Sequence, residues 1–293
     1  VVNIIYHMEN QSLDRYVGDY DKFQEVYAAK KAQLEAAYKR QQQEIAELED
    51  FVARNKARVS TRNMAMSRQK KLDKMDVIEL AAEKPKPEFH FKEARVPGRY
   101  IFQTKELVIG YDEPLSKPLT VEMERGEKLV LTGANGIGKT TLLKSILGLI
   151  PVLRGSVELG DYLEIGYFEQ EMSQDITTTC LEELWQEFPV FTQYEARSAL
   201  AKCGLTTKHI ESRVKVLSGG EQAKLRLCKL INRASNLLVL DEPTNHLDVD
   251  AKEELKRALQ EYRGSILMVC HEPEFYEGLA TKVWDCSQWT TRV

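Results

Sequence analysis

The stretch "GANGIGKTT", at positions 133–141, constrains the fold more than any other part of this chain. It follows the apolar run "KLVLT" and continues into "LLKSIL", so it predicts a strand, a glycine-rich loop and a helix in that order. Glycine permits backbone angles that other residues avoid, so successive N–H groups of such a loop can point inward at phosphate oxygens. The helix adds the positive end of its dipole. The predicted nucleotide-binding residues of this segment are Gly133, Ala134, Asn135, Gly136, Ile137, Gly138, Lys139, Thr140 and Thr141.

Four side chains have predicted chemical roles around this loop. Lys139 is expected to act catalytically by bringing its charge to the β and γ phosphates, and Thr140 to offer its hydroxyl to Mg²⁺. In "NLLVLDEPTNHLD" a continuous apolar run predicts a buried strand of the parallel type. Asp241, at the end of that run, is expected to hold Mg²⁺ through water, and Glu242 to polarise the attacking water as a general base. A simpler alternative is that the two carboxylates only cap a following helix.

The order of elements predicts an α/β fold in three parts. Residues 1–20 are short and β-like, residues 21–88 form a helical linker, and residues 89–293 alternate apolar strands with helices. Residues 21–83 contain neither Gly nor Pro, and their apolar positions recur at helical steps. Met64, Leu72, Met75 and either Ile78 or Val77 mark the apolar stripe of a second helix after the break at "VSTRN", so the linker is expected to be an antiparallel helical hairpin. "EKPKPEF" ends it, since two prolines cannot continue a helix.

Composition excludes some classes of protein. No run approaches the roughly 20 consecutive apolar residues of a membrane span, and the first residues lack the features of a signal peptide. The first residue is Val rather than Met, so we expect a fragment of a longer chain. The five cysteines have no CxxC spacing, which favours reduced, buried thiols in a cytoplasmic protein over a zinc site. A net charge of −4 argues against a general nucleic-acid coat, although an average can conceal a basic patch.

Such a patch is predicted at the turn of the hairpin. Between positions 51 and 75 only Asp73 is acidic, whereas the basic residues there are Arg54, Lys56, Arg58, Arg62, Arg68, Lys70, Lys71 and Lys74. These residues could be ordinary solvated surface charges. They could also lie against the phosphates of a polyanion, and RNA suits a tip that reads shape rather than sequence.

One further motif carries a family resemblance. "LSGGEQAKLRLCKLI", at 217–231, resembles the signature of ATP-binding-cassette ATPases. The resemblance implies ATP and Mg²⁺ as ligands, and it implies that the signature contacts the γ-phosphate held by an opposite cassette. The residues so implicated are Leu217, Ser218, Gly219, Gly220 and Glu221.

Three more residues resemble conserved family positions. Gln170 in "IGYFEQE" resembles the residue that ligates Mg²⁺ and senses nucleotide, and His271 in "VCHEPEF" resembles the switch histidine at the γ-phosphate, a catalytic role. Tyr111 in "IGYDEPL" stands where the family stacks an aromatic ring on adenine, although a tyrosine that merely ends a strand is an alternative. Cys270 and Glu272 replace the Ser and Asp that usually flank the histidine, which leaves open how its ring is held.

The rest of the chain resembles one branch of this family. The segment "VVNIIYHMENQSLDRYVGDYDKF" and the ending "ATKVWDCSQWTTRV" both look like strands that follow a switch histidine, so residues 1–20 resemble the tail of a first cassette lying upstream. With the basic hairpin and "DEPTNHLD", they resemble the ABC-F family of tandem-cassette ATPases that act on ribosomes. The resemblance implies rRNA and tRNA as partners, and either translational control or protection from antibiotics. It also implies half-sites, so the isolated chain is expected to bind ATP weakly and hydrolyse it slowly unless two copies pair head to tail.

Three alternatives remain at this point. The energy subunit of a membrane transporter would share the cassette, but this role does not explain the helical hairpin. A DNA-repair or chromosome ATPase would carry its coil inside the cassette, where the interval 139–217 leaves no room. A protein that does not hydrolyse ATP would not need Lys139 and Glu242.

Overall fold

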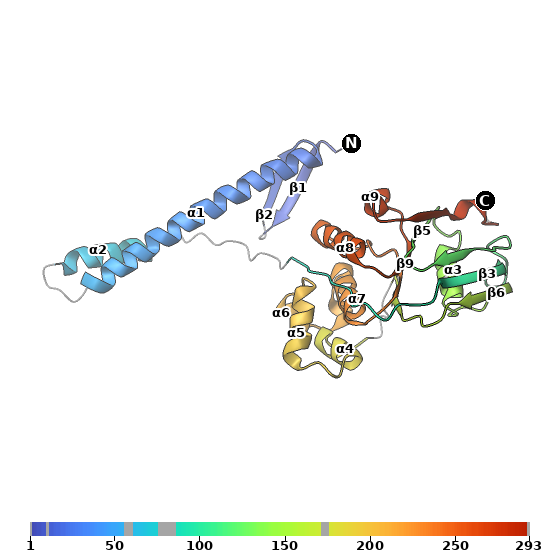
Figure 1. The fold of residues 1–293 in the computed structure, drawn as a ribbon. Helices are drawn as coiled ribbons and strands as arrows, with labels where there is room; N and C mark the ends of the chain where they lie inside the picture. The colour runs from blue at the N-terminus through green and yellow to red at the C-terminus, as the bar shows by residue number, and fades with distance from the viewer. Residues whose placement is uncertain (1, 10–11, 56–60, 76–85, 171–175, 292–293) are drawn as a thin grey trace. The chain divides into compact units, whose positions relative to one another are not determined.

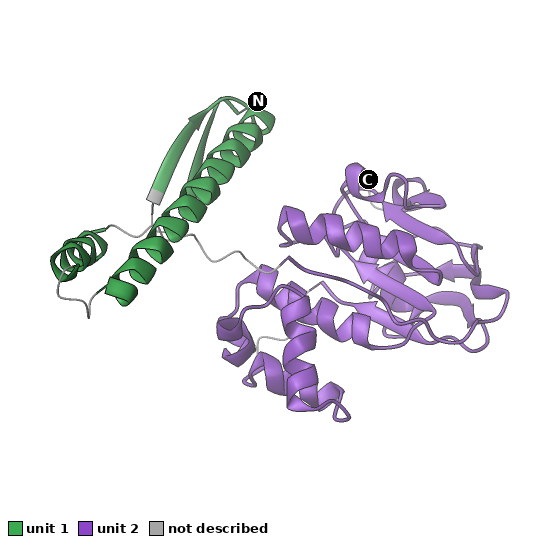
Figure 2. Cartoon of the chain, turned by 60° about the vertical axis from the view of Figure 1, so that its left-hand side comes forward, with its two compact units in different colours: residues 1–83 green, residues 84–293 purple. Residues whose placement is uncertain are grey.

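The computed structural model of the chain describes residues 2–9, 12–55, 61–75, 86–170 and 176–291. The chain divides into two compact units, residues 1–83 and 84–293, which Figure 2 shows in green and purple. The first unit contains the β-like segment together with the helical linker, and the second contains the α/β part. The finer boundaries predicted at residues 20 and 88 stay predictions.

In the first unit a small antiparallel sheet packs on a long helix (Figure 1). Strand β1 (Ile4–Glu9) pairs with β2 (Ser12–Val17), and α1 (Tyr20–Asn55) follows. The ring centroid of Phe23 on α1 lies 5.5 Å from that of His7 on β1 and 4.9 Å from that of Tyr16 on β2. These aromatic contacts hold the sheet against the first turns of α1, which continues unbroken because no Gly or Pro interrupts it.

The second helix of this unit runs back along the end of the first. In α2 (Arg62–Asp73), Lys71 pairs with Glu44 at 2.6 Å, whereas Arg68, earlier in α2, stacks 3.6 Å from the ring centroid of Phe51, later in α1. The order of these contacts makes the pair antiparallel, so the predicted helical hairpin is confirmed. The apolar stripe predicted through Met64 is wrong at that residue, which is 55% exposed. Val77 and Ile78 lie outside the described residues. Its neighbour Ala65 is fully buried instead, because a small side chain lets α2 approach α1 closely.

The second unit is built on a parallel sheet. Its strand order is β10-β5-β9-β8-β7, and every neighbouring pair is parallel. The strands are β5 (Lys128–Thr132), β7 (Ile165–Phe168), β8 (Leu237–Asp241), β9 (Ser265–Val269) and β10 (Lys282–Asp285). All five residues of β8 are buried, as the continuous apolar run before Asp241 predicted. All five residues of β9 are buried as well.

An antiparallel sheet and a group of helices complete this unit. The antiparallel order is β4-β3-β6, with β3 (Tyr100–Val108), β4 (Glu122–Glu124) and β6 (Arg154–Leu159). The helices are α3 (Lys139–Ile146), α4 (Cys180–Glu187), α5 (Gln193–Lys202), α6 (Thr207–Glu211), α7 (Gly219–Asn232), α8 (Val249–Glu261) and α9 (Pro273–Tyr276), with short 3₁₀ turns at Val214–Val216 and Cys286–Gln288. The predicted fold class, an α/β cassette with antiparallel and helical parts preceded by a helical hairpin, is confirmed.

Strand β8 contributes side chains to two hydrophobic cores. Leu238 and Leu240 pack in the core that includes α7 and α8, whereas Leu237 and Val239 pack in the core that includes α3. Successive side chains of a strand point to opposite faces, so a continuous apolar run is needed where both faces are covered. The carboxyl end of β8 lies beside the start of α3, which brings Asp241 close to the glycine-rich loop that precedes α3. None of the helices described in the structure combines the length and apolar character needed to cross a membrane.

Candidate nucleotide-binding site

The loop between β5 and α3 has the backbone geometry that its glycines predicted. Gly133, Gly136 and Gly138 have φ angles of 125°, 79° and 104°, values at which a side chain would be strained. Gly138 is the N-cap of α3 and provides no side chain to bond the first N–H groups of that helix. Unpaired N–H groups at a helix start attract anions.

Lys139 places a positive charge inside this loop. The residue is only 5% exposed, and its Nζ donates to the carbonyl oxygens of Gly133 at 3.0 Å and Ala134 at 2.6 Å. Burial lowers the pKa of Lys139, and the carboxylates of Glu242 and Asp241 act in the opposite direction. The ammonium is thus held among loop carbonyls, where an incoming phosphate would add the negative charge that a buried cation favours.

Thr140 and Asp241 form a pair of oxygen donors next to the loop. The Thr140 hydroxyl donates to Asp241 Oδ1 at 3.1 Å, and Asp241 is fully buried. Its other oxygen, Oδ2, is buried without a hydrogen-bond partner among the residues that the structure describes. Burial, and to a smaller extent Glu242, raises the pKa of Asp241. An orphaned carboxylate oxygen beside a threonine hydroxyl fits the all-oxygen coordination that Mg²⁺ prefers.

Glu242 is surrounded by side chains from three different segments. His271 Nε2 lies 3.3 Å from Glu242 Oε1, while Asn245 and Gln170 donate to Oε2 at 2.5 and 3.4 Å. The backbone of Glu242 has φ 49°, an uncommon value for a residue with a side chain. Such strain is typical of functional positions, and here it turns the carboxylate toward His271 and Gln170.

Asn245 was not singled out from the sequence, although it lies in the quoted motif "DEPTNHLD". A residue three positions after Glu242 in a turn can reach back to it, so this spacing could have identified Asn245 from the sequence. The sequence placed Gln170, Glu242 and His271 in one site, and the structure brings these three together.

The residues that flank His271 have structural partners. Cys270 is fully buried directly after β9, and Glu272 binds Lys252 on α8 at 2.8 and 2.9 Å. Neither side chain is bonded to the imidazole in the described part of the chain. The His271 ring faces Glu242 instead, so it is held by Glu242 rather than by the residues on either side of it in the sequence.

The other loop residues lie as follows. Thr141 is buried in the first turn of α3, Ile137 packs against Gly133, and Ala134 and Asn135 are exposed. Tyr111 is 62% exposed and has no ring contact among the described residues. An exposed ring is available for stacking.

The signature residues lie at the start of α7. Ser218 and Glu221 form a capping box, with Ser218 N donating to Glu221 Oε2 at 2.8 Å, and Glu221 also pairs with His209 at 3.2 Å. Leu217 is buried beside them at 8% exposure. The structure therefore shows a capped helix start here; the predicted contact with an opposite cassette stays a prediction.

The two signature glycines are required by a close approach of the loop after β8. A Cβ on Gly220 would lie 2.7 Å from the backbone oxygen of His246, which itself has φ 65°. Gly219 would meet the His246 ring at 3.1 Å. The signature helix thus packs directly on the loop that begins with Asp241 and Glu242.

Gly220→Ala is expected to lower the free energy of unfolding by about 1–3 kcal/mol, because the backbone of His246 must move to admit the methyl group. Urea denaturation followed by circular dichroism measures this loss. Gly98→Ala is the matched control, since a Cβ there would meet its nearest atom at an ordinary 3.5 Å. Equal stability of the two variants would contradict the steric account.

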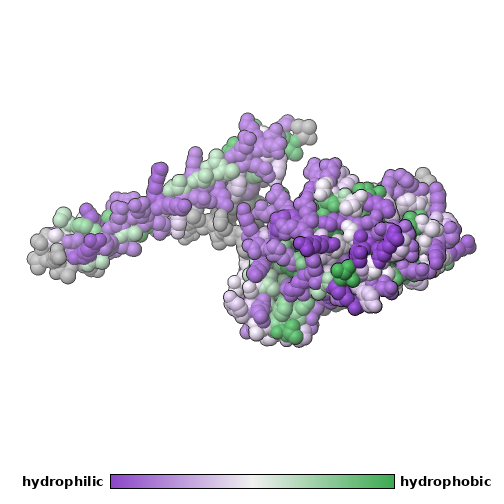
Figure 3. Space-filling view, viewed as in Figure 1, coloured by the Kyte–Doolittle hydropathy of each residue, from purple (hydrophilic) through white to green (hydrophobic). Residues whose placement is uncertain are grey.

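The basic end of the hairpin is partly paired. Arg54 Nε donates to Asp50 at 2.8 Å, and Lys71 pairs with Glu44 as described above. Arg62, Lys70 and Lys74 are exposed and have no ion pair among the described residues, and purple, hydrophilic side chains predominate along this helical pair in Figure 3. Two of the predicted tip residues, Lys56 and Arg58, lie outside the described residues. Exposed ion pairs contribute little stability, so the paired cations remain available to a stronger anion.

Comparison with known proteins identifies relatives that match both units of the chain. The family model described as "ABC transporter" matches residues 116–245, and a second model with the same description matches residues 6–91. An uncharacterized ABC transporter ATP-binding protein, YfmM of Bacillus subtilis, is 73% identical over 100% of this chain and 57% of its own length. ABC transporter F family member 2 of Arabidopsis thaliana is 36% identical over 88% of the chain and 39% of its own length. The chain thus spans about half the length of such relatives.

A solved structure gives the same fold. An ATP-binding cassette determined as a dimer bound to ADP and Pi matches with a TM-score of 0.53 at 19% identity, over 63% of this chain and 93% of that one. At this identity the match shows a shared fold alone.

Proposed function

Because the chain belongs to the ABC-F family of ATP-binding-cassette ATPases, we propose that it forms one half of a tandem ATPase that acts on the ribosome. In this proposal ATP closes two cassettes on each other, and closure places the basic end of the hairpin against rRNA and tRNA. Hydrolysis then opens the cassettes and releases the protein. The outcome is either control of translation or protection from antibiotics, and the protein works in the cytoplasm.

The residues around Glu242 support the catalytic part of the proposal. The loop N–H groups and Lys139 bind and orient the ATP phosphates, and an exposed Tyr111 stacks on the adenine. Glu242 accepts a proton from the attacking water, while Asn245, Gln170 and His271 hold its carboxylate in place and position the γ-phosphate. Bound Mg²⁺, held by Thr140, Asp241 and Gln170, would neutralise phosphate charge.

A partner cassette is needed to complete each site. Ser218, Gly219 and Gly220 lie at a capped helix start and would face the γ-phosphate of ATP held by an upstream cassette. The relatives' length leaves room for such a cassette, of which residues 1–20 would be the tail. The isolated chain would therefore hydrolyse ATP slowly, or act as a head-to-tail pair of copies. The comparisons give no better support to the alternative of a transporter energy subunit.

One observation carries the ribosomal part: the hairpin ends in exposed cations with a single acidic residue between positions 51 and 75. Three of these cations, Arg62, Lys70 and Lys74, have no intramolecular ion pair in the described residues. They can each displace a counterion from a phosphate backbone without first breaking an ion pair.

Replacing Arg62, Lys70 and Lys74 together by Gln is expected to weaken binding to ribosomes and to make it less dependent on salt. Losing three phosphate contacts lowers the slope of log affinity against log salt concentration by about 2, at about 0.7 for each contact with single-stranded RNA. Binding of the full-length protein at several KCl concentrations measures this slope.

The matched control replaces Lys22, Lys39 and Arg40, three exposed cations earlier in α1, by Gln. This variant has the same net charge but an intact tip, and its salt slope is expected to stay within about 0.5 of the original. Equal effects of the two triple variants would show that net charge, not the tip, drives binding.

A further inference from the structure

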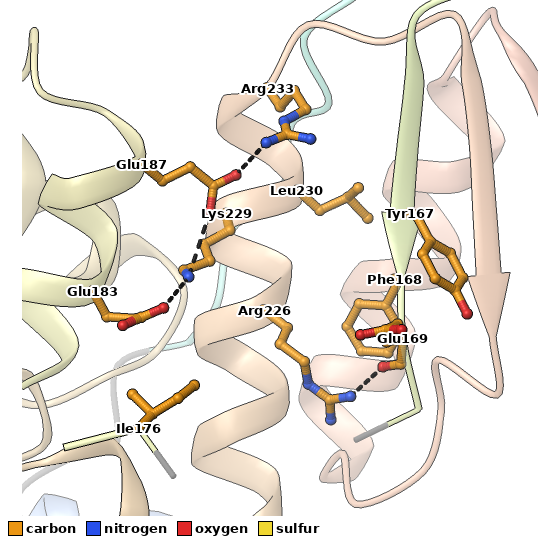
Figure 4. Close-up of a pocket in the computed structure, with 10 residues that line it drawn as sticks. All are labelled: Tyr167, Phe168, Glu169, Ile176, Glu183, Glu187, Arg226, Lys229, Leu230 and Arg233. Carbon is orange, nitrogen blue, oxygen red and sulfur yellow. Dashed lines mark hydrogen bonds and ion pairs between the residues drawn. The ribbon is translucent and has the colours of Figure 1, made fainter. Parts of the chain in front are cut away.

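A cavity of about 290 Å³ separates the end of β7 from helices α4 and α7. Figure 4 shows the residues that line it, with Phe168 and Glu169 on one side and Arg226, Lys229 and Arg233 along α7 on the other. Arg226 reaches across toward β7: its Nη1 donates to the backbone oxygen of Glu169, and its guanidinium carbon lies 4.6 Å from the ring centroid of Phe168. One side chain thus makes both a hydrogen bond and a cation–π contact with the end of β7.

The strand end that Arg226 holds leads directly into the candidate catalytic site. Gln170 follows Glu169 in the chain, and its amide donates to Glu242 at 3.4 Å. A backbone oxygen fixed at Glu169 limits where the next side chain can lie. The oxygen that Arg226 contacts therefore belongs to the peptide group that joins Glu169 to Gln170.

The other end of this connection is the signature. Arg226 and Gly219 lie on the same helix, seven positions apart, or roughly 10 Å along its axis. Farther along α7, Lys229 pairs with Glu183 on α4 at 2.6 Å, and Arg233, the C-cap residue of α7, pairs with Glu187 on α4 at 2.7 Å. Helices α7 and α4 are thus joined to each other, while Arg226 joins α7 to the sheet across the cavity.

From this geometry we propose that Arg226 is a positioning residue that couples the two half-sites of the tandem ATPase. A change at Gln170 when ATP binds in this site is transmitted through Glu169 and Arg226 to α7. This change reorients Ser218 and Gly219, which contact the nucleotide of the opposite site. This inference rests on the proposed function of the site, and it adds a route by which one bound ATP affects the other site.

The test uses Arg226→Met in the full-length protein, because methionine keeps the side-chain stem and helix propensity but removes the guanidinium. We expect the kcat for ATP hydrolysis to fall about 10-fold while KM and the dissociation constant for ATP change less than 2-fold. We also expect the ATP-dependent change in amide hydrogen exchange over residues 217–222 to disappear. Arg226→Lys, which retains the charge but not the planar donor group, is expected to restore part of both signals.

Arg233→Met is the matched control, since Arg233 is the C-cap residue directly after α7 and contacts α4 rather than β7. It is expected to keep the kcat and the exchange response of the original protein. An Arg226→Met variant that binds ATP and keeps the full exchange response would overturn the coupling alone. Failure of the original protein to bind ATP would overturn the proposed function itself.

Discussion

Glu242→Gln is expected to slow ATP hydrolysis by the full-length protein about 1,000-fold while leaving ATP binding within about 3-fold of the original. Glutamine has nearly the same shape as glutamate, so Asn245 and Gln170 keep a partner and the backbone need not change. It cannot accept a proton from water, and a positioned general base contributes about 10²–10⁴-fold to such reactions. Phosphate release under single-turnover conditions measures the chemical step directly.

Glu272→Gln is the control for this variant. Glu272 is also a carboxylate beside His271, but it binds Lys252 and does not contact Glu242 in the structure. We expect it to cost less than 10-fold in hydrolysis. If the two variants lost activity equally, the carboxylate of Glu242 would not be the base.

Lys139→Ala is expected to weaken ATP binding by about 100-fold. The ammonium is buried against the carbonyls of Gly133 and Ala134, so its charge is screened little by water and is available to the phosphates. Each hydrogen bond to a charged group contributes about 1.5–3 kcal/mol, and the loss of one or two such bonds accounts for this factor. Titration with a fluorescent ATP analogue gives the dissociation constant.

Lys144→Ala provides the comparison for Lys139→Ala. Lys144 lies on the same helix, in its last turn, and has no place in the loop. Its variant is expected to bind ATP within about 3-fold of the original protein. Similar losses in both variants would show that general positive charge, rather than a phosphate contact, attracts the nucleotide.

Local patterns in the sequence predicted the parts of the fold that depend on local chemistry. The glycines of 133–138 required positive φ angles, and the continuous apolar run of β8 required burial on both faces, which the structure shows. Gln170, Glu242 and His271 were recognised separately through their motifs, and the fold brings them together because parallel strands end at one edge of a sheet.

Contacts between distant segments could not be predicted from local sequence patterns. The choice of Ala65 over Met64 as the buried residue depends on how closely two helices approach, which the apolar stripe does not specify. The pairing of Lys71 with Glu44 depends on the register of the hairpin, and the contact of Arg226 with Glu169 depends on where α7 passes β7. In each case the residue type is common, and its role depends on which residue the fold places beside it.

The central claim is that ATP-driven closure places the basic hairpin on the ribosome. Sedimentation of the full-length Glu242→Gln variant through a sucrose cushion with ribosomes, in the presence and absence of ATP, tests it most directly. The account predicts that ATP traps this variant on ribosomes well above the level of the original protein, and that adding the Arg62, Lys70 and Lys74 changes removes most of that gain. Co-sedimentation no greater than that of the original protein, or a gain that survives loss of the tip charges, would contradict it.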